Sequence, residues 1–221
     1  MWLATTSQPY LYEGLYMNTK EKITQEALRL FSENGYKGTS VKQIADAVGI
    51  KDASLYKHFK SKQEIFDSIV EFIGQNMNSL SQKLGLPGFD ENNSSQLEFY
   101  SAISDENVIS ISKAALRFYL TDENMIKFWR IAHMEQYSNK EIYSLFQQIF
   151  INQALEFQTE LFRRMIENEV FISADPRAMA MNFYSPFFLL LTKYENQPDK
   201  TEEALELLEL QLKEFIRIYK K

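Results

Sequence analysis

The sequence predicts an all-α protein with an N-terminal three-helix helix-turn-helix domain and a larger C-terminal helical bundle. Three observations predict this class. Pairs of residues that form capping boxes open helices at several points along the chain. Apolar residues recur at three- and four-residue spacing over most of the remaining length, and the alternating pattern of strands is lacking. We expect two copies to form a homodimer through the last two helices.

Composition excludes several classes of protein. The 221 residues are 45% hydrophobic, which is ample for a folded core. The longest purely apolar run is about five residues, far below the roughly 20 that span a bilayer, so no membrane partner is expected. Cysteine is absent, which leaves no disulfide framework and no thiolate metal site. This fits a reducing cytoplasm, where we expect the protein, and no metal or cofactor is predicted.

The first sixteen residues have neither a cationic n-region nor a continuous apolar segment, so they are not a secretory signal. We expect 1–16 to be a leader that is non-native or disordered, with Met17 as the natural start. The organised chain begins at Asn18, which forms a capping-box pair with Glu21. A helix with one apolar face then continues until Gly35 ends it.

Two short helices follow within about two dozen residues. Ser40 and Gln43 form a capping box, and the apolar residues after them recur on one helix face until Gly49. A second short helix is expected from Lys51 to His58, buried through Leu55 and Phe59. Ser61 and Glu64 then cap a longer connector helix. Two short helices around a Gly-containing turn are typical of a helix-turn-helix, so we expect this domain over 17–66.

Charge supports a DNA-binding surface on this domain. Residues 37–62 hold six lysines and two aspartates, a local net charge of +4, within a chain whose net charge is −6. Such asymmetry indicates a nucleic-acid face, although a solvated helix face is the alternative. Three residues at helix starts are expected to contact phosphates: Thr39, Ser40 and Lys62. The exposed side of the second short helix is expected to carry Lys51, Ala53, Ser54, Tyr56, Lys57 and His58.

Some of these roles have alternatives. Asp52 either caps its own helix or accepts a hydrogen bond from cytosine. Tyr56 and His58 are expected on phosphate, and the alternative is that they pack against the following turn. Lys57 is the candidate for guanine recognition.

Residues 27–66 read ALRLFSENGYKGTSVKQIADAVGIKDASLYKHFKSKQEIF. In FSENGYKGTSV, IADAVGI and LYKHFKSK this stretch resembles the tetracycline-repressor (TetR) family of bacterial transcription regulators. The order Lys51, Asp52, Ala53 departs from the usual family pattern and leaves open which side chain reads the first base. The resemblance implies a dimer on a palindromic operator in double-stranded DNA. It also implies a small-molecule inducer that binds the larger domain and moves the connector helix.

The larger domain is expected over 67–221. After a loop containing Gly85, Pro87 and Gly88, helices are expected at 94–104, 107–120, 122–137, 139–168, 176–194 and 200–220. Their expected caps are Ser138 with Glu141, Asp175 before Pro176, and Asp199 with Glu202.

The last two helices have apolar faces that we expect to form the dimer interface. The residues are Phe183, Phe187, Leu191, Leu205, Leu208, Leu212, Phe215 and Ile216. The alternative is that these faces close the core of the monomer.

One face of helix 122–137 places a histidine among aromatic side chains and is our candidate for lining a ligand pocket. The expected ligand residues are Met125, Phe128, Trp129 and His133, together with Phe118, Tyr119, Phe150, Asn182 and Tyr184. The alternative is an aromatic core. The acidic excess outside the DNA-binding domain favours an apolar or cationic inducer.

An enzyme is not expected. The chain has two histidines, no cysteine, no glycine-rich phosphate loop and no GxSxG elbow, which leaves little from which to build a catalytic site. The remaining alternative is a constitutive DNA-binding or protein-interaction adaptor without a ligand pocket.

Overall fold

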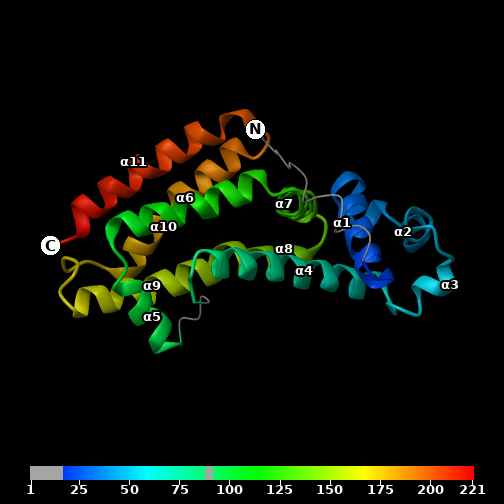
Figure 1. Cartoon of the computed structure of the whole chain (residues 1–221), viewed down its shortest axis with the longest axis horizontal. Helices are drawn as coiled ribbons and strands as arrows, with labels where there is room; N and C mark the ends of the chain where they lie inside the picture. Colours follow the sequence, from blue (N-terminus) through cyan, green and yellow to red (C-terminus); the bar gives the residue numbers. More distant parts are fainter. Residues whose placement is uncertain (1–16, 88–91) are drawn as a thin grey trace, which may run out of the picture. The chain divides into compact units, whose positions relative to one another are not determined.

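The computed structural model describes residues 17–87 and 92–221; the expected leader 1–16 lies outside them. Within the described ranges the regular structure is helical, apart from one isolated bridge between Phe171 and Lys220. The chain divides after Phe72 into two compact units, and α4 runs through the boundary (Figure 1). The expected boundary between 66 and 67 falls within the same helix. No described helix is long and apolar enough to cross a bilayer.

The first unit contains α1 (Thr19–Gly38), α2 (Val41–Val48), α3 (Asp52–Leu55) and the start of α4 (Lys62–Lys83). The expected capping boxes at Asn18 and Ser40 are confirmed, since each side chain accepts from the amide three residues on. Ser61 likewise accepts from the Glu64 amide, but the Glu64 carboxylate accepts from the Lys60 amide instead of that of Ser61.

The four elements of the first unit share an apolar core. Every element of the unit contributes fully buried side chains, among them Ile23, Leu28, Phe31, Ile44, Leu55, Phe59, Ile65, Phe66 and Ile69. Phe31 and Phe66 also pack against the ring of Tyr36, with centroids 5.2 and 5.6 Å away. Gly35 has φ 77° and ψ 161°, which kinks the end of α1 and lets the chain turn into α2. Helix α3 is therefore held in place by packing against this core.

Gly49 ends α2 in the left-handed conformation, with φ 78° and ψ 30°. A Cβ added there would meet no atom within 4 Å, so the effect of Gly49→Ala is purely one of backbone strain. We expect a loss of about 1–2 kcal/mol in the free energy of unfolding, measured by urea denaturation. Gly74→Ala is the matched control, because this helical glycine also faces open space at a negative φ. The control should stabilise by up to about 1 kcal/mol, and equal effects at both sites would contradict this account.

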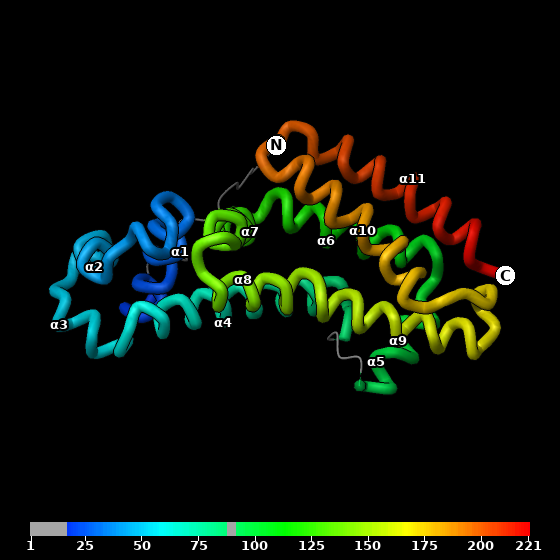
Figure 2. The backbone as a smooth tube through the Cα atoms, turned by 180° about the vertical axis from the view of Figure 1, so that it is seen from behind, coloured from blue at the N-terminus to red at the C-terminus, as the bar shows by residue number. Residues whose placement is uncertain are grey.

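The second unit holds the remaining helices (Figures 1 and 2). They are α5 (Ser94–Ser101), α6 (Asp105–Thr121), α7 (Glu123–Glu135), α8 (Lys140–Gln147), α9 (Gln153–Glu167), α10 (Pro176–Tyr194) and α11 (Thr201–Tyr219). A π-helical turn, η2 (Gln148–Asn152), joins α8 to α9, and a 3₁₀ turn, η3 (Pro198–Lys200), precedes α11. Helix α10 packs against both α9 and α11, and α11 packs against α6.

The helices predicted for the second unit are all present, but two caps and one helix differ. Asn139, and not Ser138, caps α8, since its side chain accepts from the amides of Glu141 and Ile142. The Ser138 hydroxyl donates to the Glu135 carboxylate instead. Asp199 does not cap α11, because a 3₁₀ turn leads directly into that helix. The predicted cap at Asp175 is confirmed.

The single long helix expected over 139–168 is interrupted by η2. A π turn widens the helix and shifts the side chains after it. It places Phe150 against Trp129, with ring centroids 4.9 Å apart, and the Phe150 carbonyl accepts a hydrogen bond from the Tyr184 hydroxyl. An aromatic core between α7, α8 and α10 is built around this turn.

Candidate nucleic-acid interface and ligand cavities

Helix α3 presents a polar surface on a short, well-anchored element. It is a single turn, Asp52–Leu55, followed by a turn at 56–58, so it is shorter than the expected 51–58. Leu55 and Phe59 are buried as expected. The predicted contact residues around them are exposed, except for half-buried Ser54; they are Lys51, Asp52, Ala53, Tyr56, Lys57 and His58.

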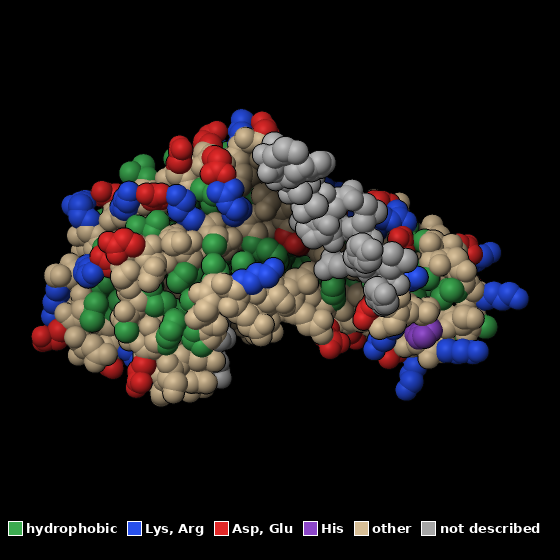
Figure 3. All heavy atoms as spheres, viewed as in Figure 1, with side chains coloured by type: hydrophobic (Ala, Val, Ile, Leu, Met, Phe, Trp, Pro, Cys, Tyr) green, Lys and Arg blue, Asp and Glu red, His purple; other side chains and the backbone are tan. Residues whose placement is uncertain are grey.

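Tyr56 is 52% exposed. The surface is therefore available to a partner, and at this end of the first unit Lys and His side chains project into solvent (Figure 3).

The interpretation of Asp52 as a helix cap is wrong. The N-cap position belongs to Lys51, which makes no side-chain capping bond, and Asp52 lies in the first turn of the helix. A negative charge in the first turn of a helix is favourable even without a hydrogen bond. The Asp52 carboxylate is exposed, so recognition of a cytosine amine stays a prediction.

The expectation that the Thr39 hydroxyl contacts phosphate needs correction. Thr39 is only 1% exposed, and its hydroxyl donates to the carbonyls of Leu30 and Gly35 at 3.2 and 3.0 Å. The side chain thus ties the end of α1 to the start of α2. Ser40 is exposed at the α2 N-terminus, where its hydroxyl is part of the capping box.

Lys62 is held against an aromatic surface. Its Nζ lies 4.2 Å from the ring centroid of Tyr36 and 5.8 Å from that of Phe31. The Tyr36 hydroxyl donates to Gln63 Oε1 at 3.1 Å, which fixes the ring. A cation held in this way is positioned at the start of α4, and a phosphate contact from it stays a prediction.

The predicted ligand residues do not line a single site. Met125, Phe128 and Phe150 are buried in the core, as the alternative interpretation expected. Tyr119, Trp129 and His133 line a cavity of about 220 Å³, which we call the aromatic cavity. Its other lining residues are Ile126, Arg130, Met134, Glu195 and Asn196. Asn182 is exposed and donates to the Tyr219 hydroxyl, away from this cavity.

Glu195 is the residue of the aromatic cavity that the sequence analysis missed. It follows α10, and its Oε2 accepts from Trp129 Nε1 and lies 3.3 Å from His133 Nδ1. No spacing along the chain links it to α7, so only the packing of the two helices brings the three together. Tyr184 donates to the Phe150 carbonyl, and burial raises the pKa of both Tyr184 and Tyr119. Both phenols therefore stay neutral hydrogen-bonding groups.

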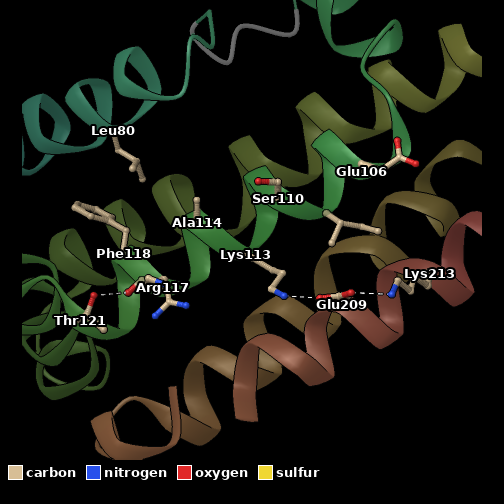
Figure 4. Close-up of a pocket in the computed structure, with 11 residues that line it drawn as sticks. Leu80, Glu106, Ser110, Lys113, Ala114, Arg117, Phe118, Thr121, Glu209 and Lys213 are labelled. Carbon is tan, nitrogen blue, oxygen red and sulfur yellow. Dashed lines mark hydrogen bonds and ion pairs between the residues drawn. The ribbon is translucent and has the colours of Figure 1, made fainter. Parts of the chain in front are cut away.

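A second hollow, of about 730 Å³, lies between α6, α11 and Leu80 of α4; we call it the α6–α11 groove (Figure 4). Phe118, expected to contact ligand, lines this groove and not the aromatic cavity. Its walls carry charged residues on both helices. Three of them are lysine or arginine and two are glutamate: Lys113, Arg117, Lys213, Glu106 and Glu209.

The predicted dimer residues lie mostly inside the monomer. Leu191, Leu205, Leu208, Leu212 and Phe215 are at most 4% exposed, and Phe183, Phe187 and Ile216 are half-buried. The five buried side chains close the core of the second unit, so their expected place in the dimer interface needs correction. A role of Phe183, Phe187 and Ile216 in that interface stays a prediction. The apolar side chains that remain exposed on α10 and α11 are Met181, Leu189, Leu207, Leu210 and Ile218. We call these five the exposed stripe.

Residues 23–69 match the sequence profile described as bacterial regulatory proteins, tetR family. A curated relative is the biofilm operon icaADBC HTH-type negative transcriptional regulator IcaR of Staphylococcus aureus. It is 46% identical over 61 residues, which cover 28% of this chain and 33% of IcaR. The chain thus matches about a third of the length of this relative.

Solved structures extend the likeness over the fold. A TetR-family transcriptional regulator from Mesorhizobium loti is 16% identical with a TM-score of 0.67, covering 92% of this chain and 97% of that chain. The complex of SmeT with triclosan is 21% identical with a TM-score of 0.65, covering 92% of each chain. SmeT is the repressor of the Stenotrophomonas maltophilia multidrug efflux pump SmeDEF. At these identities the likeness shows the fold alone.

The first unit has the helix-turn-helix arrangement, in which an exposed α3 is flanked by Lys51 and Lys57, and an all-helical unit follows it. The profile match covers residues 23–69, and the likeness in fold to a TetR-family structure covers nearly the whole chain. The matched segment 23–69 is similar to the tetR family of bacterial regulatory proteins and covers less than half of the chain.

Proposed function

We propose that this protein is a transcriptional repressor that binds a palindromic operator in double-stranded DNA as a homodimer and is released by a small molecule. The observation that carries the proposal is the exposed surface around α3, where Lys51 and Lys57 flank a helix anchored on a buried hydrophobic base within the matched segment 23–69. Repression is the proposed direction because IcaR is described as a negative regulator and SmeT as a repressor. Such a protein works where the DNA is, so we propose the cytoplasm.

The dimer is proposed to form through the exposed stripe instead of the buried faces first expected. Met181 and Leu189 lie on α10, and Leu207, Leu210 and Ile218 lie at helical spacing on α11. The two helices are joined at this surface, since Gln211 donates to the Asn182 carbonyl and Asn182 donates to the Tyr219 hydroxyl. Two such helix pairs meeting across a two-fold axis would cover the stripe on both chains. The two α3 helices would then read two half-sites.

The DNA proposal is tested by selecting bound duplexes from a random pool at near-physiological salt, where non-specific phosphate binding is weak. We expect recovery of a palindrome. If no motif is recovered and binding disappears as salt rises, the cationic surface is non-specific and the adaptor alternative replaces the repressor.

The inducer is proposed to occupy the aromatic cavity and to be cationic. Trp129, Tyr119 and His133 offer aromatic surfaces, and the Glu195 carboxylate lies among them. Aromatic faces with a carboxylate favour a cation with an apolar body. Arg130 also lines the cavity but is exposed.

We expect benzyltrimethylammonium to quench the fluorescence of Trp129, measured in a Trp2→Phe background that leaves one tryptophan. Glu195→Gln should weaken this binding by roughly five- to tenfold, as expected for loss of a charge partner. Neopentylbenzene, the uncharged compound of the same shape, should bind the unsubstituted cavity more weakly than the cation. Equal binding of the two probes would show that the cavity selects neutral apolar ligands.

A further inference from the structure

The α6–α11 groove has an apolar floor and a charged edge. In Figure 4, Phe118, Ala114 and Leu80 lie at one end, and Lys113 and Lys213 point toward Glu209 from opposite helices. Ile109 adds to the apolar lining. The volume of about 730 Å³ is within the range of small-molecule sites, roughly 300–1,000 Å³. The groove therefore has the size and the mixed lining of a site for an amphiphilic molecule.

The charges at the edge are not balanced. Lys113 of α6 forms a close ion pair with Glu209, and Lys213 of α11 lies 2.7 Å from the other oxygen of the same carboxylate. Two ammonium groups thus share one carboxylate, which leaves the trio with a net charge of +1. The two lysines also hold the pKa of Glu209 down to about 2, so this carboxylate stays ionised.

The neighbouring charges do not cancel this excess. Arg117 pairs one-to-one with Glu202, with an N–O distance of 2.6 Å. Glu106 lines the same groove, but within the described residues it forms no ion pair with Lys113 or Lys213.

We propose that the α6–α11 groove binds a small amphiphilic monocarboxylate. Its carboxylate supplies the second negative charge between Lys113 and Lys213, beside Glu209. Its hydrocarbon body covers Ile109, Ala114 and Phe118, whose apolar surface is otherwise left to water. Charge-assisted hydrogen bonds fix the head group, and burial of the tail adds affinity with its length.

This site is separate from the two surfaces of the proposed function. None of its lining residues lines the aromatic cavity. On α11, Glu209 lies about 200° around the helix from Leu207 and about 100° from Leu210, so its carboxylate lies outside the exposed stripe, whereas Lys213, one turn after Leu210, lies at the edge between the two surfaces. Leu80 belongs to α4, which begins at Lys62 in the first unit. A ligand over Leu80 thus contacts the helix that continues into the DNA-binding unit.

The test is calorimetric titration of the full chain with octanoate, and with octan-1-ol as the uncharged molecule of equal chain length. We expect one octanoate per chain and at least about tenfold weaker binding of the alcohol. Replacing both lysines by glutamine, Lys113→Gln with Lys213→Gln, should weaken octanoate at least about tenfold for the same reason. Lys140→Gln is the matched control, because this exposed lysine of α8 lines neither cavity and should leave the affinity unchanged.

Glu209→Gln provides a readout that a purely structural ion pair would not give. Removing the resident carboxylate leaves both lysines without a counter-ion, so octanoate should bind more tightly than to the unsubstituted chain. Ala114→Phe, which fills the floor, should weaken octanoate. Thermal melts of each variant show whether it is folded.

The proposal is overturned if octanol binds as tightly as octanoate, if the double lysine variant is unchanged, or if Glu209→Gln weakens binding while remaining folded. Operator binding is measured separately on the same proteins. A chain that binds a palindrome but not octanoate loses this inference alone, and a chain that binds octanoate but no operator loses the proposed function alone.

Discussion

Leu210→Glu is expected to convert the dimer into a monomer and to remove high-affinity operator binding. Leu210 is 61% exposed on α11 and is part of the exposed stripe. Because a two-fold interface contains each residue twice, one substitution places two uncompensated charges in it. An unpaired buried charge costs about 3–5 kcal/mol, so the dimer dissociation constant should rise more than about 100-fold. Sedimentation velocity measures the mass, and fluorescence anisotropy with the selected duplex measures the affinity.

Two controls show whether the effect belongs to the interface. Leu84→Glu introduces the same charge at an exposed leucine of the turn after α4, outside the stripe, and should leave the dimer intact. Leu208→Glu places it at a side chain that is 1% exposed and should unfold the second unit. If Leu210→Glu remains a dimer, the proposed interface is wrong.

Lys57→Ala is expected to weaken operator binding without changing the mass of the dimer. Lys57 is exposed beside α3, and a lysine on a guanine edge contributes about 1–3 kcal/mol, roughly a factor of 5 to 150 in affinity. Tyr56→Ala should also weaken binding and retain the dimer. Competition between the selected duplex and duplexes with single-base changes distinguishes a contact to a base from a contact to a phosphate. A base contact relaxes specificity at one position, whereas a phosphate contact weakens all sequences alike and reduces the salt slope by about one.

Lys140→Ala removes an exposed lysine from the second unit and is the control for net charge. It should leave operator affinity unchanged. Loss of the dimer in Lys57→Ala or Tyr56→Ala would contradict the division of labour between the two units.

Signals from residues close together in the sequence were sufficient to predict where several helices begin and which side chains anchor them. The capping boxes at Asn18 and Ser40, the Asp175 cap and the buried anchors Leu55 and Phe59 are confirmed, because each depends on residues within one turn of one another. The same reasoning failed at Ser138, where the neighbouring Asn139 offers a carbonyl oxygen to the helix amides. Two adjacent capping residues compete, and sequence alone does not rank them.

Tertiary packing determined which helix faces are buried and which side chains from distant parts of the chain meet, and the sequence did not predict either. Periodicity showed that α10 and α11 have apolar residues, but these helices are apolar on two sides. The side with Leu205 and Leu212 is covered within the chain, and that with Leu189 and Leu210 is exposed. Thr39 was misjudged because its acceptors lie on the preceding helix. The contribution of Glu195 required two helices far apart in sequence to meet.

The most direct test asks whether the protein binds DNA as a sequence-specific dimer. It measures the number of chains bound per duplex and the affinity, first on the selected palindrome and then on a duplex with one half-site scrambled. The measurement is made at near-physiological salt. We predict two chains per palindrome and a large loss of affinity on the single half-site, because each α3 helix is short and makes few contacts alone. One chain per duplex, with equal affinity for both DNAs, would contradict the account.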